Sequence, residues 1–152
     1  MTDSANVKIL PPIIPMSAVA VGGAIHFYAP IQISNSSALL IAGITFVLVS
    51  IIIVAVAAKE LSNAKTAFDV RKPSTSLVTS GIFRYSRNPT YLSMIALCFG
   101  IAMLANSVPL LLTSALAGSG LCLMVVRREE TYLESKFGAE YKSYRQAVRM
   151  WF

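Results

Sequence analysis

The chain has 152 residues, of which 55% are hydrophobic and only 13% are charged. Soluble domains carry about 25% charged residues, so this composition is typical of a membrane protein and argues against a water-soluble enzyme. The length allows one helical bundle without a separate soluble domain, so we expect a single domain over residues 1–152. The net charge is +6, and the placement of the basic residues says more than their sum.

The first two apolar runs predict two membrane-spanning helices. The first run covers about residues 13–33 and is interrupted by Pro15, His26 and Pro30. No basic segment and no small-residue cleavage site mark it as a removed signal peptide, so we interpret it as a retained anchor. The second run, residues 38–58, has no charge over 21 residues. At 1.5 Å per residue, that length matches a hydrocarbon core of roughly 30 Å.

The third and fourth apolar runs predict a helical hairpin. They cover residues 91–105 and 108–126, and the polar pair Asn106-Ser107 lies between them. A connection this short requires the two helices to be antiparallel neighbours. The fold class predicted from all four runs is therefore an all-α integral membrane protein with four transmembrane helices.

Lysine and arginine predict how these helices are oriented. One basic residue precedes the first run, six lie between the second and third runs, and six follow the fourth, which accounts for all 13. The connections at residues 34–37 and 106–107 hold none. By the positive-inside rule, both termini and the central loop are expected in the cytoplasm.

Residues 127–151 predict an additional, amphipathic helix. Large apolar residues recur every three or four positions from Leu133 to Trp151, and charged residues fill the other faces. Such a helix either lies on the membrane surface or folds back over the cytoplasmic mouth of the bundle. Gly138 is expected to loosen or break it.

A basic and aromatic segment before the third run is the first candidate site. Residues 81–91 read Gly-Ile-Phe-Arg-Tyr-Ser-Arg-Asn-Pro-Thr-Tyr. In one interpretation, Arg84 and Arg87 are anchors that pair with lipid phosphates. In the other, the segment binds a flat polar ligand, because arginine alternates with aromatic residues and Asn88-Pro89 fixes a turn that presents the side chains from a rigid position.

A second polar cluster, Arg127-Arg128-Glu129-Glu130, follows the fourth run. It can be a solvated helix start, since adjacent helical residues face different directions. At a membrane boundary, however, at least one of the two acids is expected to point toward the mouth of the bundle. A carboxylate there can bind ribose hydroxyls or an amino group, or act as a base. Spacing alone leaves both interpretations open.

The remaining reactive residue types indicate no site. His26, Cys98 and Cys122 lie in apolar runs and are expected to be packed, structural residues. No cluster has the spacing of zinc ligands, and no glycine-rich phosphate loop is present. We therefore expect no metal, and a basic surface without a soluble domain also argues against nucleic acid as a partner.

Together, the polar clusters and the tail resemble the isoprenylcysteine carboxyl methyltransferase and phospholipid methyltransferase superfamily. The resemblance covers roughly residues 66–151. It implies an integral-membrane enzyme that moves a methyl group from S-adenosylmethionine to a lipophilic acceptor and leaves S-adenosylhomocysteine. The residues that carry it are 77–92, Arg128-Glu129-Glu130-Thr131-Tyr132-Leu133, Phe137-Gly138 and Tyr141-Lys142-Ser143-Tyr144.

The resemblance also implies site residues. Many isoprenylcysteine enzymes carry histidine where this chain has Asn88, and an asparagine cannot serve as a general base near neutral pH. For catalysis we expect Glu129 or Glu130 to accept a proton from an amine acceptor, and Arg84, Arg128 or Arg149 to orient a carboxylate acceptor. Of these, Arg84, Glu130 and Arg149 are the catalytic residues we single out. The residues expected to hold the cofactor are Arg87, Asn88, Pro89, Tyr91, Leu92, Glu129 and Glu130.

The acceptor has two interpretations within this class. The first is O-methylation of a prenylcysteine-like carboxylate, and the second is N-methylation of an amine-headed phospholipid. In a different class, the chain is a non-catalytic membrane protein whose clusters serve as anchors and partner contacts. The expected partners are a lipophilic small molecule or lipid substrate and the membrane lipids. The four-helix size suits a prokaryotic inner membrane, with the active site on the cytoplasmic face.

Overall fold

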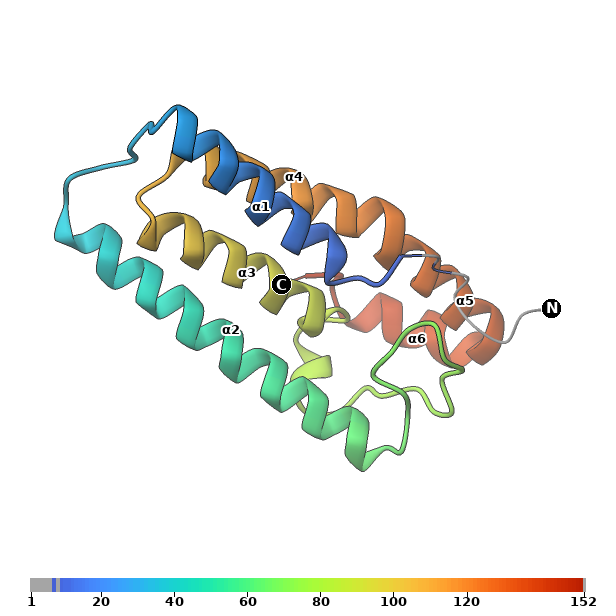
Figure 1. Cartoon of the computed structure of the whole chain (residues 1–152). Helices are drawn as coiled ribbons and strands as arrows, with labels where there is room; N and C mark the ends of the chain where they lie inside the picture. The colour runs from blue at the N-terminus through green and yellow to red at the C-terminus, as the bar shows by residue number, and fades with distance from the viewer. Residues whose placement is uncertain (1–6, 8, 152) are drawn as a thin grey trace. The chain divides into compact units, whose positions relative to one another are not determined.

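Every regular element in the described part of the chain is helical. The computed structural model describes residue 7 and residues 9–151. In chain order the elements are α1 (Ile13–Tyr28), α2 (Ser37–Asn63), the 3₁₀ helix η1 (Gly81–Arg84), α3 (Pro89–Leu104), α4 (Val108–Leu121), the π-helical stretch η2 (Cys122–Val126), α5 (Arg127–Phe137) and α6 (Ala139–Ala147) (Figure 1). The all-α prediction is therefore confirmed.

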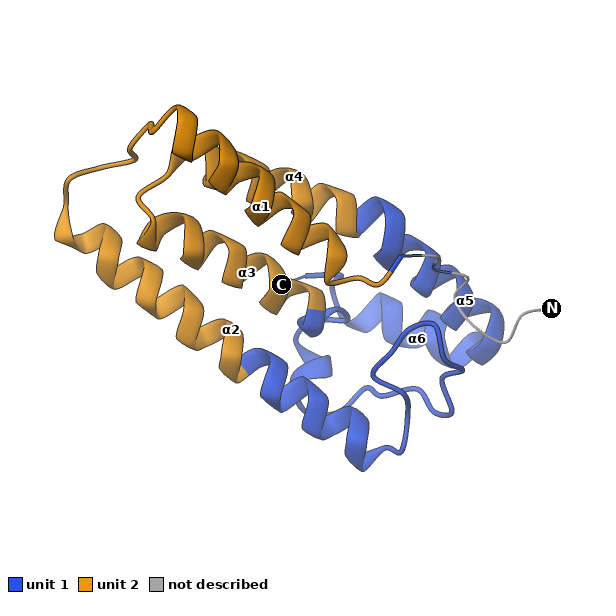
Figure 2. Cartoon of the chain, in the orientation of Figure 1, with its two compact units in different colours: residues 1–9, 53–90, 122–152 blue, residues 10–52, 91–121 orange. Residues whose placement is uncertain are grey.

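The chain divides into two compact units, which Figure 2 shows in different colours. Unit 1 comprises residues 1–9, 53–90 and 122–152, and unit 2 comprises residues 10–52 and 91–121. Unit 1 holds the central loop, the acidic pair Glu129-Glu130 and the tail. Unit 2 holds most of the apolar helical residues.

Glycines let the helices of unit 2 approach one another closely. A Cβ atom at Gly22 of α1 would come within 2.9 Å of the Leu110 Cα on α4. A Cβ atom at Gly100 of α3 would lie 3.0 Å from the Val47 backbone nitrogen on α2. Helices in an apolar environment associate through such small-residue contacts, because no hydrophobic effect drives them together.

The predicted turn between the third and fourth apolar runs is confirmed at Asn106, which has a φ of 47°. Asparagine tolerates this left-handed region better than most residues. Its side-chain Oδ1 accepts hydrogen bonds from the backbone nitrogens of Ile33 and Ser34 at 2.9 and 3.0 Å. The turn is thereby tied to the connection between α1 and α2.

Two helices among the described residues are long and apolar enough to cross a membrane, Ser37–Asn63 and Val108–Phe137. Helices α1 and α3 have only 16 residues each, about 24 Å of helix against a hydrocarbon core of roughly 30 Å. Helix α1 ends at Tyr28 and not at residue 33, because Pro30 disfavours helical geometry at the residue before it. Four complete spans and cytoplasmic termini stay predictions.

The single tail helix predicted over residues 127–151 is wrong in its extent. Gly138 has φ 55° and ψ −121°, a conformation that requires glycine, and it separates α5 from α6 as expected. Helix α6 then ends at Ala147, and Val148 is extended, with φ −123° and ψ 136°. The last described residues are non-helical because they bind the central loop, as described below.

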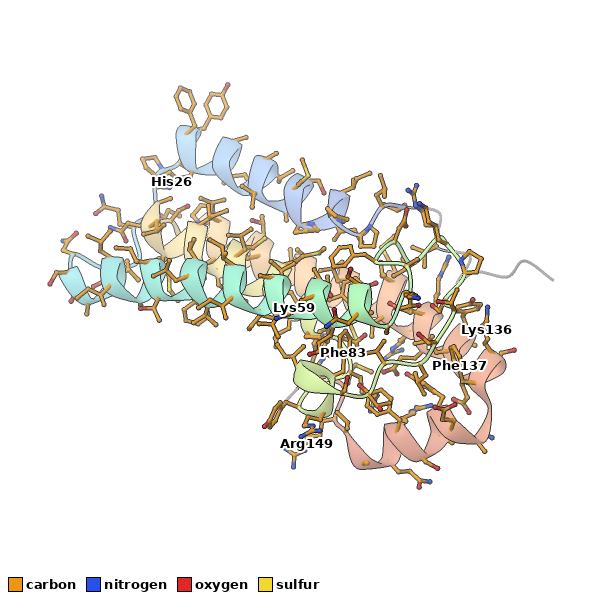
Figure 3. The ribbon with its side chains drawn as sticks, turned by 90° about the horizontal axis from the view of Figure 1, so that it is seen from below. His26, Lys59, Phe83, Lys136, Phe137 and Arg149 are labelled. Atoms are coloured by element: carbon orange, nitrogen blue, oxygen red, sulfur yellow. The ribbon has the colours of Figure 1, made fainter. Side chains whose placement is uncertain are left out.

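The apolar stripe of the tail forms the core of unit 1. Tyr141 and Tyr144 are buried together with Ala57, Val78 and Phe83. Leu133, Phe137 and Val148 are among the half-buried side chains packed against this cluster, and Phe83 and Phe137 are labelled in Figure 3. The stripe is thus covered by unit 1 itself.

Candidate functional site

The site lies where the central loop turns into α3, at residues 86–89, which we call the corner. Helix η1 leads into it, and Pro89 begins α3, the position in which a missing N–H costs nothing. Gly81 begins η1 with a φ of 57°, against the side chain of Glu60 on α2. The Ser80 hydroxyl donates a hydrogen bond to Glu60 Oε2 at 3.0 Å. These contacts fix the entry to the corner.

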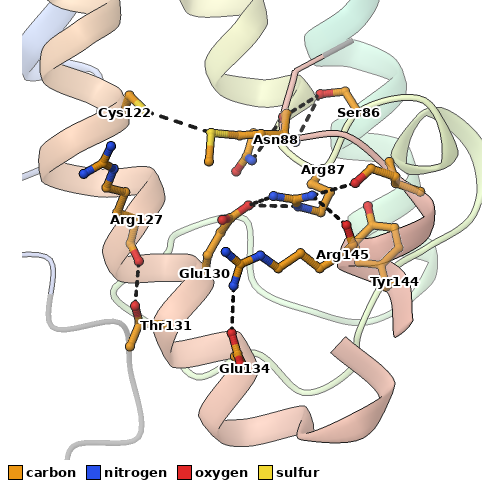
Figure 4. A network of polar contacts seen from close by, with 12 residues as sticks. Ser86, Arg87, Asn88, Cys122, Arg127, Glu130, Thr131, Glu134, Tyr144 and Arg145 are labelled. Carbon is orange, nitrogen blue, oxygen red and sulfur yellow. Dashed lines mark hydrogen bonds and ion pairs between the residues drawn. The ribbon is translucent and has the colours of Figure 1, made fainter. Parts of the chain in front are cut away.

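A buried ion pair joins the corner to the acidic pair. Arg87 Nη2 lies 2.7 Å from Glu130 Oε1, and Arg87 Nε donates to the same oxygen at 2.9 Å (Figure 4). The two side chains are only 7% and 8% exposed. The two sequence clusters therefore meet within unit 1, although 43 residues separate them along the chain.

Arg87 also holds the end of the tail. Its Nη1 donates hydrogen bonds to the carbonyl oxygens of Val148 at 2.6 Å and Arg145 at 3.1 Å. Its backbone nitrogen donates to the Arg149 carbonyl at 3.1 Å. All three side-chain nitrogens of Arg87 are thus engaged within the chain. This guanidinium positions the Glu130 carboxylate and is not an open cation.

Asn88 and Ser86 bind the next carbonyl of the tail. Asn88 Nδ2 donates to the Met150 carbonyl at 3.3 Å, and the Ser86 hydroxyl donates to the same oxygen at 3.2 Å. The Ser86 hydroxyl also accepts a hydrogen bond from the Asn88 backbone nitrogen at 3.2 Å. Asn88 is 6% exposed. Its amide is therefore a buried structural donor.

Helix geometry places the Glu130 carboxylate. The π-helical stretch Cys122–Val126 immediately precedes α5, and such stretches frequently occur at functional sites. Glu129 and Glu130 follow this stretch on a helix that runs on from α4 through η2 without a break, since Val126 itself is helical, with φ −57° and ψ −48°. Both contacts of Glu130 use Oε1. Within the described part of the chain, Oε2 stays available to accept from a ligand.

Two buried tyrosines keep their protons beside this carboxylate. Burial raises the pKa of Tyr141 and Tyr144 above the ordinary value; the negative charge of Glu130 adds to the rise at Tyr141, whereas at Tyr144 the positive charge of Arg87 partly opposes it. Both phenols are therefore neutral at physiological pH. The Tyr144 hydroxyl donates to the Phe83 carbonyl at 2.6 Å. That bond ties α6 to η1, the helix that leads into the corner.

The other predicted site residues are arranged differently. Arg84 and Arg149 have exposed side chains in unit 1, whereas Glu129 is half-buried and Pro89 is buried. Tyr91 and Leu92 belong to α3 in unit 2, and their roles stay predictions. Among the described residues, no group of three His, Cys, Asp or Glu side chains lies close enough to hold a metal ion.

Sequence reasoning missed four contributors to the site. Glu60 carried no signal in the sequence, and Ser86 lay in the candidate segment but was given no role of its own. The contacts at residues 148–150 use backbone carbonyls, which every residue has. Tyr144 belonged to the apolar stripe and to the motif that carries the resemblance, but neither assigned it a contact. Its hydrogen bond to Phe83 depends on the fold.

Comparisons with known proteins identify a family that this chain matches. A sequence profile described as phospholipid methyltransferase matches residues 38–140, which is 103 of the 152 residues. A stretch of 26 residues is 69% identical to an uncharacterized protein of Haemophilus influenzae and covers 17% of this chain and 41% of that protein. The match thus spans less than half of that relative. No solved structure matches the chain.

Proposed function

The chain belongs to the phospholipid methyltransferase family, and from this premise we propose that it transfers a methyl group from S-adenosylmethionine to a lipid-like acceptor. The family and the long apolar helices support a membrane methyltransferase. The observation that carries the proposal is the buried Glu130 carboxylate, which Arg87 fixes through Oε1. We place the active site on the cytoplasmic face of a prokaryotic inner membrane.

The residues of the site fit S-adenosylmethionine. That cofactor carries a sulfonium, an ammonium and ribose hydroxyls, all of which a carboxylate attracts or accepts hydrogen bonds from. Glu130 offers Oε2, and Glu129 lies beside it in the same helical turn. The cofactor also carries a carboxylate, which suits an exposed guanidinium such as Arg84 or Arg128. Contacts from Asn88, Pro89, Tyr91 and Leu92 stay predictions, and the Asn88 amide is engaged with the Met150 carbonyl.

When bound, the cofactor supplies a methyl group on a positively charged sulfur. The contribution of the chain is to hold donor and acceptor in line and to exclude water. Glu130 is suited to this role because its carboxylate is held in one position. Arg87 restrains its carboxylate through Nε and Nη2.

We propose an acceptor with an anionic group, oriented by the exposed Arg84 and Arg149. A prenylcysteine-like carboxylate meets this requirement and needs no base for O-methylation. An amine-headed phospholipid also carries an anionic phosphate, and Glu129 or Glu130 would accept the proton that its amine loses. The acid pair at the start of α5 is the observation that favours this second acceptor.

Methyl transfer from labelled S-adenosylmethionine tests the proposal. The purified protein in lipid vesicles is incubated with a prenylcysteine analogue or an ethanolamine phospholipid. A base-labile labelled product indicates a methyl ester, and a base-stable product indicates N-methylation. Absence of labelled product from every acceptor, together with undetectable binding of S-adenosylhomocysteine, would favour a non-catalytic membrane protein.

A further inference from the structure

The last described residues are bound tightly by the corner. Residues 148–151, which we call the C-terminal strap, lie beyond residues 38–140, the part that matches the family profile. Three successive carbonyl oxygens of the strap each accept a hydrogen bond from the corner. They are those of Val148, Arg149 and Met150.

We propose that the C-terminal strap is a positioning element of the methyl-donor site. It holds the Arg87 guanidinium and the Asn88 amide in place, and through Arg87 it fixes the Glu130 carboxylate. This inference rests on the proposed function. The inference adds the strap to the site, although the strap lies outside the matched residues 38–140. Its backbone acts through Arg87 and Asn88 and is not proposed to touch donor or acceptor.

The need for the strap follows from the hydrogen-bonding capacity of Arg87. A guanidinium has five N–H donors, and here a single carboxylate oxygen of Glu130 serves only two of its nitrogens. A buried donor without an acceptor costs free energy, so the remaining nitrogen needs the carbonyls of Val148 and Arg145. Without the strap, the guanidinium would gain by turning toward water, and Glu130 would lose its partner.

Side chains also hold the strap against the rest of unit 1. Val148 packs on the core cluster that contains Phe83 and Tyr144. The Met150 sulfur lies 3.9 Å from the Cys122 sulfur at the start of η2 (Figure 4). Met150 therefore links the strap to the stretch that leads into α5 and Glu130. A substitution of Met150 can therefore release the strap while every residue of the corner stays the same.

The chain contains a built-in reporter of the strap. Trp151 is the single tryptophan in the sequence, and it is half-buried. Its emission therefore reports whether the strap is docked, in the absence of any ligand. Release of the strap would shift the emission to longer wavelength and make it more accessible to a soluble quencher.

The test combines this emission with S-adenosylhomocysteine binding to the full protein in detergent. Met150→Asp places a charge against Cys122 and should expose Trp151 and weaken the ligand by about tenfold or more. Deletion of residues 148–152 should weaken S-adenosylhomocysteine binding by the same factor. Met150→Leu and Gln146→Ala, which alters an exposed residue of α6, should leave both emission and affinity unchanged. Circular dichroism confirms the helical content of each variant.

The outcomes separate the two proposals. A folded deletion variant that binds with wild-type affinity, or Trp151 emission that Met150→Asp leaves unchanged, overturns the role of the strap. A wild-type protein that binds no S-adenosylhomocysteine, while Trp151 still responds to Met150→Asp, refutes the proposed function and supports the hold of the corner on the strap.

Discussion

Replacement of Arg87 by methionine should destabilise the protein more than any other single loss of charge in the site. The guanidinium makes two contacts with Glu130 and two with tail carbonyls, and both members of the ion pair are at least nine-tenths buried. Removal of one partner from a buried ion pair costs about 3–5 kcal/mol, because the other charge stays behind without compensation. For a chain of this size, that loss corresponds to a melting temperature lower by roughly 6–20 °C.

Thermal unfolding in detergent, followed by helical circular dichroism, measures this loss. Arg84→Met is the matched control for stability, since it removes an exposed arginine three positions earlier and should change the free energy of unfolding by about 0.5 kcal/mol or less. The double variant Arg87→Met/Glu130→Leu removes both charges and should recover most of the stability, but it should not bind S-adenosylhomocysteine. If Arg87→Met melts together with Arg84→Met, the ion pair does not hold unit 1 and our reasoning fails.

Three further predictions follow from single contacts. Tyr144→Phe leaves a buried carbonyl unpaired and should cost about 1–3 kcal/mol in thermal unfolding; equal melting of variant and wild type would contradict it. Gly22→Ala should destabilise by about 1–3 kcal/mol through a clash with the backbone of α4, whereas Gly23→Ala, with open space around it, should be neutral or stabilising. Hydrogen bonds from the Arg71 side chain and backbone lower the pKa of Asp69 from 3.8 to about 2. The contribution of Asp69 to stability is thus present above pH 4 and lost as the pH falls through 2. Its carboxyl carbon should titrate near pH 2 by NMR, and Arg71→Ala should restore the ordinary pKa.

The apolar runs predicted the helices well, because hydrophobicity over a long window depends little on tertiary contacts. The largest error was in the tail. Its periodicity described one face of a helix correctly, since Tyr141 and Tyr144 are buried as the stripe requires. The spacing of apolar residues could not show that the helix ends at Ala147. The carbonyls of the following residues accept hydrogen bonds from Ser86 and Arg87, about 60 positions earlier, and such distant partners leave no periodic pattern.

The sequence predicted which charged side chains belong to the site, but it did not predict what each of them contacts. Arg87 and Glu130 were both expected to hold a cofactor, and the structure pairs them with each other. Residue type reveals a charge but not its partner, so the sequence could not show that the guanidinium is already satisfied. Contacts through backbone carbonyls leave no trace in residue identity at all.

Equilibrium binding of S-adenosylhomocysteine to the wild-type protein and to Glu130→Gln tests the central claim most directly. The substitution keeps the size of the side chain and removes the negative charge that we assign to the cofactor site. We expect titration calorimetry to show binding by the wild type and a loss of affinity of about tenfold or more in Glu130→Gln. Equal affinity in the two proteins, or no binding by the wild type at millimolar ligand, would contradict a methyl-donor site at Glu130.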